Sequence, residues 1–224
     1  MNAPLLFLLI LSAAALPSAT PAQTSPPSGP VIVADFSNPD LVPSHWTITL
    51  RRDGSGHFHS DRGQPAPGET KEMDVPNVDR EFQVSAVYAD HVFQVAQQHN
   101  WFNQECESHL KVAFQGWKKF SYSGPDAQGS CTFNYSKDKQ IQDLGDSLMG
   151  VSETLIEGAR LEMLLQHDRL GLDREMEFLA EAAKDGRLRE IGAIREILGR
   201  LEADPEVLDR VRKKARILLA HAAT

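Results

Sequence analysis

The spacing of apolar residues changes near residue 137, and this change constrains the fold more than any other feature of the sequence. Before it, short segments alternate apolar and polar residues, as strands with one buried face do. After it, apolar residues recur every three or four positions, as on one face of a helix. The sequence therefore predicts an α+β protein. We expect an antiparallel meander sheet with one packed helix over residues 31–136, followed by an antiparallel array of about four helices over residues 137–222.

The first hairpin of this sheet is expected around a glycine-rich turn. Residues 46–51 and 57–60 alternate apolar and polar side chains, and the Arg-Asp-Gly-Ser-Gly segment between them is a hairpin signal. A three-residue loop places Leu50 opposite Phe58, which keeps the apolar side chains of both strands on one face. A two-residue loop would instead place Leu50 opposite His57, so the longer loop is the prediction.

A second meander is predicted further along the chain. Residues 110–114 and 118–122 are expected to pair through a three-residue loop, with Val112 opposite Phe120. Residues 131–135 then add a third strand, again with alternating apolar side chains. These pairings would place all the apolar faces on the same side of one sheet.

A strand and a helix are predicted between the two meanders. Residues 81–85 alternate as a strand, and residues 86–98 have the apolar spacing of a helix. Ser85 has a side chain that can cap this helix by accepting a hydrogen bond from its first turn. The helix is therefore expected to begin directly after Ser85 and to pack on the sheet.

The second region carries several start and stop signals for helices. A long helix is expected over residues 139–169. Glycine destabilises the interior of a helix, so the presence of Gly150 and Gly158 is explained by a kink or a close helix contact near one of them. Asp173 is interpreted as the N-cap of the next helix. Asp204 is interpreted as the N-cap of the last helix, because a proline follows it.

The beginning of the chain resembles a secretory signal. Residues 5–16 are apolar, but a membrane span needs about 20 such residues. A short apolar run followed by small residues is typical of a signal peptide, with cleavage after Ala22 favoured and Ala15 and Ala19 as alternatives. The expected organisation is a signal peptide at 1–22, a disordered lead-in at 23–30, a sheet with a helix at 31–136 and a helical region at 137–222.

Composition excludes several classes of function. The net charge is −8, whereas nucleic-acid binders normally present a basic face, so no nucleic-acid partner is expected. No Walker A loop, Gly-x-Gly-x-x-Gly pattern or Gly-x-Ser-x-Gly elbow occurs in the sequence, and no cofactor is predicted. No membrane span is predicted either. The identity of a partner and the oligomeric state stay open.

Several segments together resemble a known group of proteins. They are RDGSGHFHSD, DREFQVS, NWFN, KVAFQGWKKFSY and FNYS, followed by GLDREMEFLAEAAKDG and DPEVLDRVRKKARILL. In this order they look like a group of uncharacterised secreted bacterial proteins of unknown function, over about residues 45–220. The resemblance implies a domain of hairpin, helix and hairpin followed by a helical region. It implies no activity, because these motifs are turns and apolar faces.

The two cysteines are a candidate disulfide. An exported protein meets oxidising conditions, which favours a bond between Cys106 and Cys131. The expected strand order opposes it, because Cys106 would then lie two strands away, about 10 Å, and a disulfide needs Cα atoms within about 7 Å. A bond therefore requires residues 103–108 to curl back over the sheet. The alternative is a pair of free thiols, with Cys131 in the core.

Three residues of the first hairpin are a candidate metal site. His57, His59 and Asp61 alternate along one strand, so all three project from the same face. Imidazole and carboxylate groups bind zinc, and catalytic zinc sites use three protein ligands. The simpler interpretation is a solvated face of the hairpin, because polar residues normally occupy such a face. The parity of the apolar side chains predicts that both imidazoles face water.

Acidic pairs at helical spacing are a weaker candidate for acid–base chemistry. Glu153 and Glu157, like Glu177 and Glu181, are expected on a solvated helix face.

The sequence thus favours an exported, non-catalytic protein with a protein-interaction or structural role in the cell envelope or extracellular space. It would bind its partner through the helical array or a sheet edge. The first alternative is a metal-dependent hydrolase that uses the histidine and aspartate residues of the hairpin. A third interpretation is a binder of a small ligand between sheet and helices.

Overall fold

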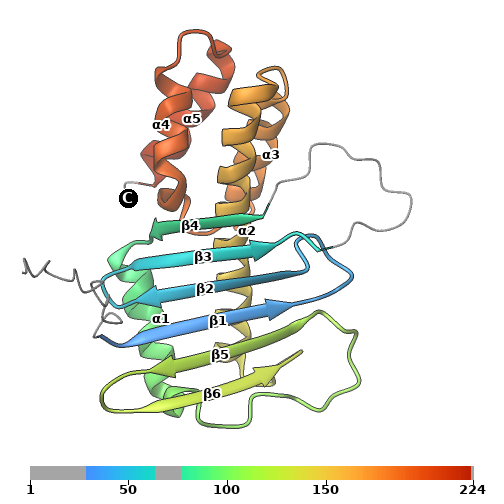
Figure 1. The fold of residues 1–224 in the computed structure, drawn as a ribbon, viewed down its shortest axis with the longest axis vertical. Helices are drawn as coiled ribbons and strands as arrows, with labels where there is room; N and C mark the ends of the chain where they lie inside the picture. The colour runs from blue at the N-terminus through green and yellow to red at the C-terminus, as the bar shows by residue number, and fades with distance from the viewer. Residues whose placement is uncertain (1–28, 64–76, 223–224) are drawn as a thin grey trace, which may run out of the picture.

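The computed structural model of the chain describes residues 29–63 and 77–222, so the expected signal peptide and most of the lead-in lie outside the described residues. Six antiparallel strands form one sheet in the order β4-β3-β2-β1-β5-β6 (Figure 1). The strands are β1 (Val31–Ser37), β2 (His45–Arg51), β3 (Ser55–Asp61), β4 (Val78–Gln83), β5 (Trp117–Ser123) and β6 (Gln128–Phe133). One α-helix lies between β4 and β5 and the other α-helices follow β6, which confirms the α+β class.

The first hairpin has the predicted parity but a different register. Leu50 lies opposite Gly56 and not Phe58, and Phe58 lies opposite Ile48. The loop has three residues as predicted, but it begins at Arg52, because Gly54 supplies the left-handed backbone (φ 83°) at its third position. A shift of two residues leaves every side chain on its expected face.

The second predicted hairpin is wrong in its first strand. Residues 103–116 contain no strand, and the side chains of Leu110, Val112 and Phe114 are 40–49% exposed. Strand β5 pairs instead with β1, an alternating segment that has the same local pattern as residues 110–114. Strand β6 is also shifted, with Cys131 opposite Phe120. Local alternation cannot show which of two alternating segments pairs with β5. The packing of the whole sheet determines that this strand is β1.

Helix α1 (Ala86–Gln98) and the long helix α2 (Lys139–His167) lie behind the sheet in Figure 1. Helix α1 has the predicted bounds, and the Ser85 hydroxyl accepts a hydrogen bond from the Tyr88 amide. Even-numbered strand residues such as Phe36, Ile48 and Phe58 bury their side chains on this side. The α1–α2 layer therefore covers one face of the sheet.

Beyond strand β4, helix α2 continues into the helical array (Figure 1). The array also contains α3 (Leu172–Lys184), the 3-10 helix η2 (Ile191–Ile194), α4 (Arg195–Ala203) and α5 (Asp209–His221), and a second 3-10 helix, η1 (Asn100–Phe102), follows α1. Two predicted N-caps are wrong. Asp173 lies inside the first turn of α3, and α5 begins five residues after Asp204, whose side chain caps a turn at Glu206.

Two glycines of helix α2 allow close contacts, as the sequence predicted. A Cβ atom on Gly150 would lie 2.7 Å from the carbonyl oxygen of Arg187, and one on Gly158 would lie 2.4 Å from the Cγ2 atom of Ile194. The Gly150 carbonyl also accepts a hydrogen bond from the Arg189 amide (3.2 Å). These contacts hold the chain before α4 against α2. Within the described residues, no helix has both the length and the apolar character needed to cross a membrane.

Candidate functional site

The face of the sheet opposite α1 and α2 is turned towards the viewer in Figure 1, and no helix of the described residues lies across it. Side chains with the opposite parity to the core project from this open face. The open face carries polar and charged side chains from four neighbouring strands, among them Asp35, His45, Thr47, Thr49, His57, His59, Asp61, Asp79 and Glu81.

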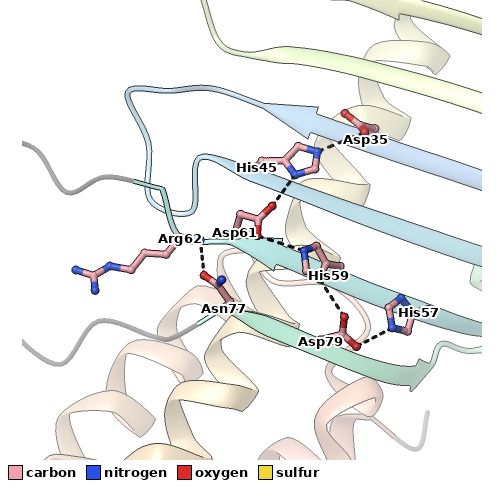
Figure 2. Close-up of polar contacts among 8 residues, drawn as sticks. All are labelled: Asp35, His45, His57, His59, Asp61, Arg62, Asn77 and Asp79. Atoms are coloured by element: carbon pink, nitrogen blue, oxygen red, sulfur yellow. Dashed lines mark hydrogen bonds and ion pairs between the residues drawn. The ribbon is translucent and has the colours of Figure 1, made fainter.

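Six of these side chains form an alternating line of carboxylates and imidazoles, which we call the His–Asp row (Figure 2). Its order is Asp35, His45, Asp61, His59, Asp79 and His57. The strand register explains this order, because β2, β3 and β4 place His45 opposite Asp61 and His59 opposite Asp79.

The centre of the row surrounds His59 with two carboxylates. Its Nδ1 atom lies 3.0 Å from Asp79 and its Nε2 atom lies 3.3 Å from Asp61. Only a doubly protonated imidazole can donate from both nitrogens, so these contacts favour the cation. The hydrogen bond to Asp79 raises the pKa of His59 above its usual value of 6.5, with Asp61 adding to the effect. In return, His59 and His57 lower the pKa of Asp79.

The other two imidazoles of the row also contact carboxylates, His45 through both ring nitrogens and His57 through one. His45 has one ring nitrogen 3.4 Å from Asp35 and the other 3.3 Å from Asp61, so it too has a carboxylate at each nitrogen. At the other end, Nε2 of His57 lies 3.0 Å from Asp79. The three imidazole side chains are 34–38% exposed. The row is therefore an ordered, solvent-facing network and not a buried site.

The predicted set of His57, His59 and Asp61 lies on the open face, as its parity indicated. The three side chains do not converge on one point, because Asp79 lies between the two imidazoles and Asp61 contacts the far side of His59. Across residues 29–63 and 77–222, no group of three or more His, Cys, Asp or Glu side chains could hold a metal ion.

Sequence reasoning missed half of the row. Asp35 lies on β1, which had no assigned strand bounds, and His45 begins β2 one residue before the predicted strand. Asp79 was missed because β4 begins at Val78 and not at residue 81. The alternation of Asp79 with Glu81 was the signal for this earlier start, since both residues have the parity of a solvated face.

The disulfide Cys106–Cys131 forms, with Cα atoms 5.7 Å apart. The chain before β5 does run back along β6, as the bond required. The Ser108 amide donates to the Tyr135 carbonyl (2.9 Å), and the Asn134 amide donates to the Glu107 carboxylate (2.6 Å). The objection from strand order fails because residues 110–114 are not the strand next to β5.

One of the acidic pairs departs from its prediction. Glu157 is not on a solvated face, because its residue surface is only 5% exposed where α2 meets Glu175 of α3. Burial raises the pKa of Glu157 to about 9, and a hydrogen bond with Glu175 adds to the shift. Arg160 lies 3.8 Å from both carboxylates. Glu177 and Glu181 are exposed, as expected.

Comparison with protein-family models gives no match for this chain. Comparison with curated proteins gives no match either. The function must therefore be argued from the geometry of the chain itself.

Proposed function

We propose that this chain is an exported, non-catalytic protein that binds a basic surface of another protein through the open face of its sheet. The observation that carries the proposal is the His–Asp row, an ordered line of acidic and imidazole groups on an uncovered face. The sequence favoured a protein-interaction role through the helical array or a sheet edge, and the row moves the proposed surface to the face of the sheet.

Export is supported by two features. Residues 5–16 have the length and apolar character of the core of a signal peptide and lie outside the described residues. The disulfide Cys106–Cys131 belongs to oxidising compartments such as the periplasm or the extracellular space.

The proposal that the protein is non-catalytic rests on the contacts that the imidazole nitrogens make with carboxylates. Both ring nitrogens of His45 and of His59 contact carboxylates, so neither ring presents a free lone pair to a substrate or a metal ion. A metal-dependent hydrolase would need at least two of these rings to turn away from their carboxylates and converge. The direct measurement is the zinc content of the purified protein.

The partner's charge is inferred from the charges of the open face. Asp35, Asp61, Asp79 and Glu81 contribute four carboxylates to this face, against the two permanent cations of Arg51 and Lys119, in a chain of net charge −8. Trp117, at the corner of this face and 47% exposed, adds an aromatic side chain of the type enriched in protein interfaces. A basic partner surface complements the excess of carboxylates, and protonation of His59, whose pKa the hydrogen bond to Asp79 raises, weakens the attraction as the pH falls.

The test places a photo-crosslinking side chain at Thr47, in the middle of the open face, in cells that produce the chain naturally. A matched probe at Glu181 reports on the exposed side of α3. The captured protein is then purified, and its affinity for the chain is measured directly by calorimetry between pH 8 and pH 5.5.

We expect capture from Thr47 alone and an affinity that falls as the pH is lowered. The double variant Asp61→Asn/Asp79→Asn should weaken binding by about tenfold, which corresponds to about 1.4 kcal/mol, while Glu181→Gln should leave it unchanged. Capture from Glu181 alone, or equal affinity for the double variant, contradicts the proposal. Stoichiometric zinc in the purified protein that is lost in His57→Ala would instead support the metal-dependent hydrolase.

A further inference from the structure

A pocket of about 860 Å³ lies away from the open face, between the end of β4 and the helical array. The junction of β4 and α1 lines it with Gln83, Val84, Ser85 and Val87. Residues of α3, η2, α4 and α5 complete the lining. In Figure 1 the C-terminal end of α5 lies close to this junction of β4 and α1. Ligand sites in proteins enclose about 300–1,000 Å³, so the pocket has the size of a site for a small molecule.

The lining of the pocket is mostly apolar. Val84, Ile191 and Leu218 contribute side chains that belong to the core or pack against it. Val87 and Ile217 also line it, yet they are 81% and 56% exposed. Two large aliphatic side chains that face water beside a concave surface are the arrangement that a ligand with an apolar body would cover.

The charged side chains of the lining are mainly basic. Lys184 of α3 and Arg195 of α4 both line the pocket, and in the described part of the chain neither forms a salt bridge. His221 lines it as well. Two permanent cations in one pocket contrast with the overall charge of −8, and they favour an anion there.

The single carboxylate of the lining, that of Glu190, is already engaged. It accepts hydrogen bonds from the Ser85 amide (2.6 Å) and the Ser85 hydroxyl (3.1 Å). Glu190 takes a left-handed backbone (φ 53°), which is strained for a residue with a side chain. This contact joins the array to the β4–α1 junction, and the lining keeps one carboxylate against the two permanent cations.

We infer that this pocket binds an anionic amphiphile of the fatty-acid class, with the carboxylate at Lys184 and Arg195 and the alkyl chain against the aliphatic lining. The combination of an apolar wall and two accessible cations without a salt bridge in the described residues carries this assignment, because a carboxylate can reach both cations while its chain covers the aliphatic side chains. This function is separate from the proposed protein-binding face and uses none of its residues.

The test is a calorimetric titration of the purified mature protein with decanoate below its micellar concentration. Two matched probes accompany it: acetate, which lacks the chain, and decyltrimethylammonium, which reverses the charge. Decanoate should bind with a stoichiometry of one and should raise the unfolding temperature, since a ligand of the folded state stabilises it. Acetate and decyltrimethylammonium should not bind.

Variants locate the site. Lys184→Gln/Arg195→Gln should weaken decanoate binding by about tenfold, and Ile217→Asp, at an exposed position that tolerates a polar side chain, should weaken it as much. Lys137→Gln, an exposed cation outside the pocket, is the matched control and should not change the affinity. Equal binding by all variants, equal binding of decanoate and decyltrimethylammonium, or no binding of decanoate overturns the inference.

Discussion

At the scale of single residues, burial decides what an ionisable side chain can do. The imidazole of His59 keeps 38% of its surface in water, and its two carboxylate partners favour the cation. Glu157 has lost nearly all contact with water, and Arg160 at 3.8 Å does not replace the lost hydration. The same acidic and basic residue types therefore form a charged network on the sheet and a neutral carboxyl group between two helices.

The raised pKa of Glu157 predicts that its replacement stabilises the protein in a pH-dependent way. With a pKa of about 9 in the folded state and 4.5 in the unfolded state, the carboxyl group takes up a proton on folding, so its cost grows as the pH rises from 4.5 towards 9. Glu157→Gln cannot ionise. It should raise the free energy of unfolding by about 1–3 kcal/mol at pH 7.5 and by little at pH 5, as measured with urea.

The exposed residue Glu181 on α3 provides the control, because Glu181→Gln should change stability by less than about 0.5 kcal/mol at either pH. An equal gain for Glu157→Gln at both pH values would show that its carboxyl group is ionised in the folded protein.

At the scale of elements, the local sequence predicted the buried faces of the strands and the extent of helix α1 well, and the pairing partners of the strands badly. Helix α1 begins after its Ser85 cap as predicted, and both β2 and β3 turn the predicted side chains inwards. Residues 110–114 have the alternation of a strand, yet β1 takes the place beside β5. Capping and parity depend on neighbouring residues, whereas pairing is a competition between segments that lie far apart in the sequence.

The close contact at Gly158 predicts opposite effects for two glycine-to-alanine substitutions. Gly158→Ala places a methyl group 2.4 Å from Ile194, a buried and branched side chain, so it should lower the free energy of unfolding by about 1–3 kcal/mol. Gly199→Ala in α4 meets no atom within 4 Å and should raise it by about 0.5–1 kcal/mol, because alanine favours the helix. Urea unfolding measures both, and a gain in stability for Gly158→Ala would contradict the close packing of α2 against η2.

At the scale of the whole molecule, helix α2 connects the sheet to the helical array, and the disulfide connects the irregular chain before β5 to the sheet. Helix α2 packs behind the sheet and continues into the array, so one element belongs to both (Figure 1). The disulfide ties the irregular chain before β5 to β6, where few regular backbone hydrogen bonds hold it. The open face and the pocket described above lie on surfaces that this framework fixes in place.

The disulfide predicts a measurable loss of stability on its removal. Cys106 and Cys131 are 25 residues apart in sequence, and closing a loop of this length removes unfolded-state entropy worth about 3 kcal/mol. The double variant Cys106→Ser/Cys131→Ser should therefore lower the free energy of unfolding by about that amount in oxidising buffer. The unaltered protein should lose the same stability when a reductant is added, and the variant should not respond to it. A stability that reductant leaves unchanged would show that the bond does not constrain the unfolded chain.

The sequence by itself determined the fold class, the solvent-facing side of His57 and His59, and the extent of helix α1. These follow from rules that act between residues close together in the chain, namely the two-residue repeat of a strand and the capping of a first turn. Tertiary structure alone decided that β1 lies beside β5, that Asp79 meets His59 and that Glu157 is buried against Glu175. Each of these depends on which distant segments pack together, because burial and electrostatic environment are properties of the assembled core and not of the local sequence.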